Sequence, residues 1–333
     1  MLIKDKVYGE EEINEPVLID LINSKTLQRL KGISQQGLPQ DYYHRIVFSR
    51  FEHSIGVMIL LRKLDADIEE QIAGLLHDIS HTAFSHVVDW VLGDPTKEDY
   101  QDNNHLNIIE NSDVPNILKK YGFNYKDVAN VESFSLLEKH APSLCVDRFD
   151  YTIRELKDLG KDDLVKLCVT NLKNINGQMV FETKQSAESF ANEYLRLQKE
   201  HWAGNDARAR YYILAQILRK AIDSKLISKE DLMKTDQFII NLLENSKNQE
   251  ILEQLDMLKN GFKIEESKEG IELKKKFRYI DPEVLTEEGI TNLTKISLGY
   301  KEALEREKTN KDSFVKINII KLGSKPFVAN ELS

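Results

Sequence analysis

The fold is decided by two stretches, RFEHSIGVMILLRKL at residues 50–64 and IEEQIAGLLHDISHTAFSH at residues 68–86. Apolar residues spaced three and four apart follow His53, which therefore lies on the buried face of an amphipathic helix. The second stretch begins after Asp67, a residue type that favours the helix N-cap. Its segment 72–76 carries no charge, so we expect a second helix that is buried on all sides.

The same stretches concentrate histidine and aspartate. Six of the eight histidines of the chain lie between His44 and His105, and the doublet His77–Asp78 lies near the end of the second expected helix. A buried aspartate needs a partner, because an isolated charge is very costly in a low dielectric. Nitrogen and oxygen ligands on two inward-facing helices suit a borderline or hard divalent metal. The alternative is a pair of core histidines with an aspartate that caps the next turn.

A third helix is predicted by LCVDRFDYTIREL at residues 144–156, where apolar residues recur at spacings of three and four. On the opposite side, Asp147, Tyr151 and Arg154 share a face, and Arg148 lies beside them. Asp147 is the candidate for a carboxylate that completes the metal site. The arginines and the tyrosine suit an anionic substrate bound next to the metal. The same pattern is also typical of an ordinary solvated face.

Three blocks, RFEHSIGV, LLHDISHTAFSH and VDRFDYTIRE, resemble the signature blocks of the HD-domain phosphohydrolases. The resemblance is to the branch that contains the deoxynucleoside triphosphate triphosphohydrolases, and it extends from TLQRLKGISQQGLP to about Glu155. It implies an all-α helical core with short peripheral β-hairpins. It also implies a metal-dependent hydrolase of phosphoric esters or anhydrides.

The resemblance assigns roles to individual residues of this chain. The implied metal ligands are His53, His77, Asp78 and Asp147. The implied catalytic residues are His81, His105 and Asp147. The implied substrate contacts are Gln35, Arg50, His86, Arg148, Tyr151 and Arg154. This ligand set favours one divalent metal, for which Mn, Mg, Fe, Ni and Zn are all admissible, while the additional histidines leave a second metal open.

These roles predict a hydrolase of nucleotides, foremost nucleoside or deoxynucleoside triphosphates. Two alternatives remain open. The first is a nucleotide-binding sensor or oligomeric scaffold with weak turnover, and the second is an HD nucleotidase or phosphodiesterase. We expect the protein to form a homo-oligomer.

Composition limits the classes of partner. The 333 residues include 55 acidic and 46 basic side chains, and the net charge of −9 argues against a large nucleic-acid surface. No apolar run is long enough to span a membrane, and the charged start of the chain lacks a signal-peptide core. Cys145 and Cys168 form neither a disulfide framework nor a metal-finger spacing. This usage is typical of a reducing, cytoplasmic interior.

Outside the three blocks the sequence predicts a hairpin within residues 1–15 and an exposed loop over residues 94–104 that could act as a lid. We expect an HD phosphohydrolase core at residues 1–175 and a mostly helical lobe at residues 176–333. In that lobe, KKKFRYIDPEVL at residues 274–285 predicts a strand edge with solvated lysines. Its alternative is an anion or nucleotide contact between subunits.

Overall fold

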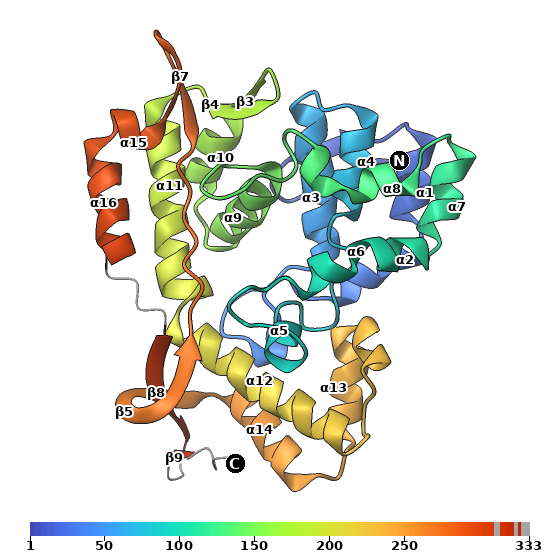
Figure 1. Cartoon of the computed structure of the whole chain (residues 1–333), viewed down its shortest axis with the longest axis vertical. Coiled ribbons are helices and arrows are strands. Elements are labelled where there is room, and N and C mark those ends of the chain that lie inside the picture. Colours follow the sequence, from blue (N-terminus) through green and yellow to red (C-terminus); the bar gives the residue numbers. More distant parts are fainter. Residues whose placement is uncertain (310–313, 323–325, 328–333) are drawn as a thin grey trace.

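The computed structural model describes residues 1–309, 314–322 and 326–327 (Figure 1). The α-helices in these ranges are α1 (Pro16–Ile22), α2 (Lys25–Arg29), α3 (Arg50–Lys63), α4 (Ile68–Leu76), α5 (Val87–Val91), α6 (Tyr100–Glu110), α7 (Val114–Lys120), α8 (Tyr125–Ala129), α9 (Val146–Asp158), α10 (Asp162–Thr170), α11 (Lys184–Leu197), α12 (Asn205–Asp223), α13 (Asp236–Glu244), α14 (Gln249–Asn260), α15 (Leu293–Ile296) and α16 (Leu298–Thr309). The strands are β1 (Leu2–Asp5), β2 (Gly9–Glu12), β3 (Leu172–Ile175), β4 (Gln178–Phe181), β5 (Phe262–Lys274), β6 (Glu283–Thr286), β7 (Gly289–Asn292), β8 (Phe314–Lys321) and β9 (Pro326–Phe327).

Helix α3 forms the centre of the helical part and packs against both α4 and α9. The ends of these helices are set by capping: Ser49 and Glu52 form a capping box at α3, and the Asp67 side chain accepts a hydrogen bond at the start of α4. Glycines let the helices approach closely. A Cβ on Gly74 would lie 2.3 Å from Leu61 Cδ1, and one on Gly56 would lie 1.7 Å from Arg154 Nη2. The predicted helical core is thus confirmed.

The prediction that strands would be short peripheral hairpins is confirmed only in part. The β1–β2 hairpin fits it, but two further sheets have the strand orders β3-β4-β6-β7 and β5-β8-β9, and β5 alone has 13 residues. In the first of these sheets β4 pairs with β6 in parallel. The prediction missed this pairing because it joins segments about 100 residues apart, beyond the reach of local periodicity.

Apolar side chains from both halves of the chain form one continuous core. The predicted boundary at residue 175 falls at the turn between β3 and β4, and the division into two lobes stays a prediction. The expected exposed loop at residues 94–104 is wrong in part, because α6 begins at Tyr100 and Glu98 is buried. In the described part of the chain, no helix has both the length and the apolar character to cross a membrane.

Candidate metal and phosphate site

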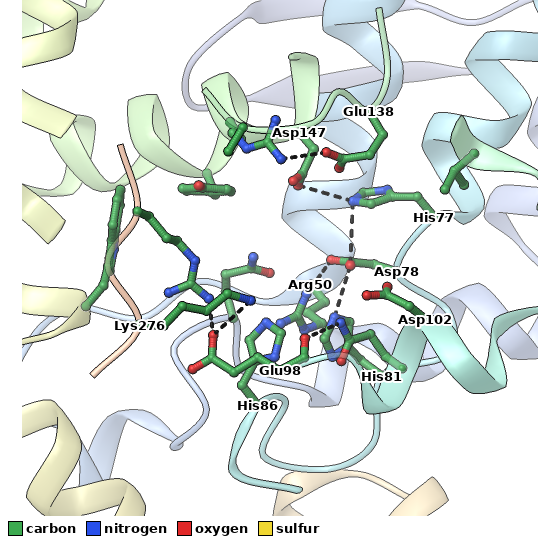
Figure 2. A pocket seen from close by; sticks show the side chains of 18 of the residues that line it. Arg50, His77, Asp78, His81, His86, Glu98, Asp102, Glu138, Asp147 and Lys276 are labelled. Atoms are coloured by element: carbon green, nitrogen blue, oxygen red, sulfur yellow. Dashed lines mark hydrogen bonds and ion pairs between the residues drawn. The ribbon is translucent and has the colours of Figure 1, made fainter. Parts of the chain in front are cut away.

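Three helices bring together the four side chains that the sequence proposed as metal ligands. His53 comes from α3, His77 and Asp78 follow the last turn of α4, and Asp147 lies in the first turn of α9. Figure 2 shows His77, Asp78 and Asp147 pointing toward one another across one end of a cavity.

The distances between these ligand atoms suit one ion. His53 Nε2 lies 2.9 Å from Asp147 Oδ1 and 3.2 Å from His77 Nε2, while His77 Nε2 lies 3.5 Å from Asp147 Oδ1. Asp78 is slightly farther, with its oxygens 3.6 Å from His77 Nε2 and 3.7 Å from His53 Nε2. Ligand atoms that share an ion through bonds of about 2.0–2.2 Å lie roughly 3–3.5 Å apart. His53, His77 and Asp147 lie close enough together to hold a divalent metal, and Asp78 lies at the edge of this group.

The electrostatics of the cluster favour a positive charge at this point. Burial alone would lower the pKa of His77, but Asp78 and Asp147 outweigh it and raise the pKa to about 9. Burial would raise the pKa of Asp147, yet hydrogen bonds from His53 and His77 hold it well below its usual range. A bound divalent cation would supply the positive charge that these carboxylates stabilise.

A chain of buried contacts orients the His53 ring on the side opposite the ligand cluster. Its Nδ1 lies 2.8 Å from Asp150 Oδ1, and Arg154 Nε donates to the same oxygen at 2.7 Å. Arg154 Nη2 in turn donates to Asp5 Oδ2 in the N-terminal hairpin at 2.6 Å. A carboxylate at one ring nitrogen fixes the tautomer and leaves the other nitrogen facing the ligand cluster.

The structure does not place Arg154 beside a substrate, and its expected substrate contact stays an untested prediction. Arg154 does not line the cavity and is fully buried between Asp150 and Asp5. Arg154 lies two turns along α9 from Asp147. At that level α9 packs against α3 at Gly56, which closes the face to a ligand.

The cavity has a volume of about 790 Å³. Its lining includes all the other side chains that the sequence proposed for the site, except His53, which reaches the ligand cluster from the buried side. They are Gln35, Arg50, His77, Asp78, His81, His86, His105, Asp147, Arg148 and Tyr151.

Both expected phosphate-contacting arginines on the lining are held by protein groups. Arg50 donates to Asp78 Oδ2 at 2.6 Å and to Ser85 Oγ at 2.7 Å, so its charge lies directly beside the ligand cluster. Arg148 donates to Glu138 Oε1 at 2.8 Å and to the carbonyl oxygen of Lys139 at 2.5 Å. A phosphate contact for Arg148 stays a prediction.

Two buried histidines present nitrogen atoms that have no hydrogen-bond partner among the described residues, His81 Nδ1 and His105 Nε2. Burial, with Arg50 nearby, holds the pKa of His81 well below its usual range, and burial together with His77 lowers the pKa of His105 to about 4. Both imidazoles are therefore neutral near pH 7. A neutral imidazole that has one nitrogen without a hydrogen-bond partner is able to take up or pass on a proton.

Sequence reasoning missed an aromatic wall on the same cavity. The Tyr151 and Tyr194 hydroxyls lie 2.8 Å apart, and the Trp202 ring packs 4.9 Å from the Tyr194 ring and 5.3 Å from the Tyr151 ring, centroid to centroid. Trp202 Nε1 donates to Glu155 Oε2 at 2.7 Å, which fixes the indole. Tyr194 and Trp202 carry no motif, so nothing in the sequence marked them. The basic and aromatic run at residues 276–279, which the sequence did mark, also lines the cavity.

Comparison with known protein families matches residues 50–154 to the HD domain. The Bacillus subtilis protein YdhJ is 38% identical over 324 residues, which cover 95% of this chain and 99% of that protein. The metal-dependent phosphohydrolase cns2 of Cordyceps militaris is 31% identical, over 85% of each protein.

Two more distant relatives extend the comparison. A deoxynucleoside triphosphate triphosphohydrolase SAMHD1 homolog of Dictyostelium discoideum is 24% identical, over 78% of this chain and 58% of that protein. The crystal structure of a phosphohydrolase from Bacteroides thetaiotaomicron shares the fold, with a TM-score of 0.71 at 19% identity over 96% of this chain and 99% of that chain. The match at residues 50–154 and the near-complete coverage by YdhJ and cns2 lead to one conclusion: the chain belongs to the HD-domain family of metal-dependent phosphohydrolases.

Proposed function

We propose that this chain hydrolyses nucleotides, foremost nucleoside or deoxynucleoside triphosphates, with His53, His77, Asp78 and Asp147 as the ligands of one divalent metal. The observation that carries the proposal is that one cavity of about 790 Å³ holds the ligand cluster together with cationic and aromatic side chains. Its volume is within the range of about 300–1,000 Å³ typical of small-molecule sites. A nucleotide requires cationic side chains for its phosphates, ligands for its metal and an aromatic face for its base.

The proposal assigns a role to each group of side chains that lines the cavity. A divalent metal held by His53, His77, Asp78 and Asp147 would polarise a phosphoryl oxygen and lower the pKa of bound water. Arg50 offsets phosphate charge beside the ligand cluster, and the neutral imidazole of His81 or His105 handles the proton. The aromatic wall of Tyr151 and Trp202 offers a face for the sugar or base.

Two observations bear on the length of the phosphate chain. The name of the Dictyostelium relative, a deoxynucleoside triphosphate triphosphohydrolase, supports a triphosphate. Both terminal nitrogens of Arg148 donate to protein acceptors, Glu138 Oε1 and the carbonyl oxygens of Lys139 and Ser143, which favours the alternative, a nucleotidase that acts on monophosphates.

A release assay separates the candidates. The purified chain is incubated with dATP, dADP, dAMP and ATP in the presence of Mn, Mg, Fe, Ni or Zn, and phosphate, pyrophosphate and triphosphate are quantified. Release of triphosphate or phosphate from dATP or ATP supports the proposal, and release from dAMP alone favours the nucleotidase. A chain that binds nucleotides by thermal shift but hydrolyses none of them with any metal would be the sensor, and the proposal would be wrong.

Removing the metal should abolish turnover and lower the midpoint of thermal unfolding. An ion that binds only the folded state contributes about 4 kcal/mol at a thousandfold excess over its Kd. For a chain of this size we expect a decrease of roughly 5–15 °C after dialysis against EDTA. Differential scanning calorimetry before and after chelation measures the change, and re-addition of the metal is the control. An unchanged midpoint together with unchanged activity would contradict a metal at this cluster.

A further inference from the structure

The cavity has a second charged wall, which is formed by a segment from the far end of the chain. Residues 276–279 follow β5 in extended form, and Lys276 and Arg278 both line the cavity. Figure 1 shows the orange segment that leads from β5 to β6 and β7 running alongside α11, and Figure 2 shows Lys276 on the opposite side of the cavity from His77. The predicted strand edge with solvated lysines is wrong for these residues, because β5 ends at Lys274 and their side chains are partly buried.

A buried carboxylate gathers the cations of this wall. Glu98 is 5% exposed, and its Oε1 lies 3.1 Å from Arg208 Nη1. Its Oε2 accepts from Arg278 and lies 3.9 Å from Lys276 Nζ. Glu98 thus positions three cations that come from α12 and from the segment after β5.

Around Glu98 three cations meet one carboxylate, and the Asp102 and Asp89 carboxylates also act on Lys276. This wall also holds hydrogen-bonding atoms that no described protein group uses. Arg208 is 1% exposed, and no atom of the described residues accepts from its Nε. Gln101 Oε1 on the same lining is equally without a donor in the described part of the chain. Buried polar atoms of this kind are normally satisfied, so these atoms point to a ligand.

The order of the basic side chains along the cavity indicates which part of a ligand this wall meets. Arg50 and His81 lie beside Asp78 at the metal end, and the imidazole of His86 is 5.0 Å from that of His81, centroid to centroid. His86 lines the cavity together with Glu98 and Lys276, so a row of basic side chains leads from the metal end to this wall. A chain of phosphates that starts at the metal and follows this row would end at Lys276 and Arg278.

We propose that Lys276 and Arg278, held by Glu98, form a second anion subsite for the phosphates of the substrate that are remote from the metal. This inference rests on the proposed function, because it assumes a nucleotide at the metal end. It adds that the subsite selects substrates by the length of their phosphate chain. A monophosphate has no group that reaches the subsite. A triphosphate gains charge-assisted hydrogen bonds there.

The test compares Lys276→Gln with Lys274→Gln. Lys276 is the suitable target because its replacement leaves the ion pairs of Glu98 with Arg208 and Arg278 in place. Lys274 is two residues away, exposed and absent from the cavity lining, which makes it a matched control. Arg278→Gln is the second variant, and metal content and the thermal midpoint of all three are measured to establish that they fold.

We expect Lys276→Gln to raise KM for a nucleoside triphosphate about tenfold and KM for the matching monophosphate by less than about twofold. Arg278→Gln should act in the same direction, and Lys274→Gln should change neither value. Equal changes for the two substrates, or no change in either variant, would overturn the subsite.

Binding of inorganic phosphates tests the subsite independently of nucleotide turnover. By isothermal titration calorimetry, tripolyphosphate should bind the metal-loaded protein at least about tenfold more tightly than orthophosphate, and Lys276→Gln should remove most of that difference. If wild type binds both ions equally, the subsite is refuted even where nucleotides are hydrolysed. If tripolyphosphate binds through Lys276 but no nucleotide is hydrolysed, the subsite stands and the proposed function fails.

Discussion

Replacing His77 with alanine should remove the bound metal and lower kcat by a factor on the order of 10³ or more, while the fold survives. His77 Nε2 lies 3.2–3.6 Å from ligand atoms of His53, Asp147 and Asp78, so its loss leaves a gap in the cluster. Its Nδ1 contacts only the carbonyl oxygen of Gly74, at 2.7 Å within the same helical turn. The side chain therefore contributes to the site far more than to the packing of α4.

The matched control is His44→Ala, which removes a partly exposed imidazole that contacts Asp206 and is not part of the cavity lining. Metal content by inductively coupled plasma mass spectrometry, phosphate release and far-UV circular dichroism are measured for both variants. His44→Ala should retain the metal and turnover of wild type. If His77→Ala retained stoichiometric metal and full turnover, His77 would not be a ligand.

Replacing Arg154 with alanine should destabilise the fold by about 3–5 kcal/mol, because it leaves Asp150 and Asp5 as buried carboxylates without a cation. Both carboxylates are almost inaccessible: Asp150 has no exposed side-chain surface and Asp5 has 5%. The orientation of His53 also depends on Asp150, so weaker metal binding should accompany the loss of stability. Urea unfolding of the metal-free protein measures the free energy without the contribution of the metal.

Arg196→Ala is the control for Arg154→Ala. Arg196 also contacts two carboxylates, Glu193 and Glu200, but its side chain is 31% exposed. Solvent screens both of these ion pairs, so the change should lower the free energy of unfolding by less than about 1 kcal/mol. If Arg154→Ala kept the stability of wild type and instead raised KM for nucleotides, Arg154 would be the substrate contact that the sequence implied.

The part of the site that could be predicted from the sequence is the part encoded locally. Apolar spacing and a capping aspartate located the helices that carry His53 and His77, and the predicted helix over residues 144–156 corresponds to α9. The convergence of these helices could be predicted because four ligands of one ion must lie within a few ångströms of one another. The roles of the four residues as metal ligands stay predictions.

The parts that could not be predicted depend on partners that are distant in the chain. Arg154 is buried because Asp5, 149 residues earlier, accepts its hydrogen bond. Glu98 is buried because Arg208 and Arg278 surround it, although its neighbours from 94 to 104 are polar and favour a loop. No periodicity within one segment indicates such pairings. The homo-oligomer also stays a prediction.

The ion pair between Arg154 and Asp5 has a consequence for how far this catalytic unit can be shortened. The family match covers residues 50–154 and so ends at the arginine but omits its carboxylate partner in β1. A fragment trimmed to that match would expose the Arg154 guanidinium to solvent on one side and loosen Asp150, which orients His53. The residues that orient His53 therefore reach back beyond the family match to Asp5 in the first strand.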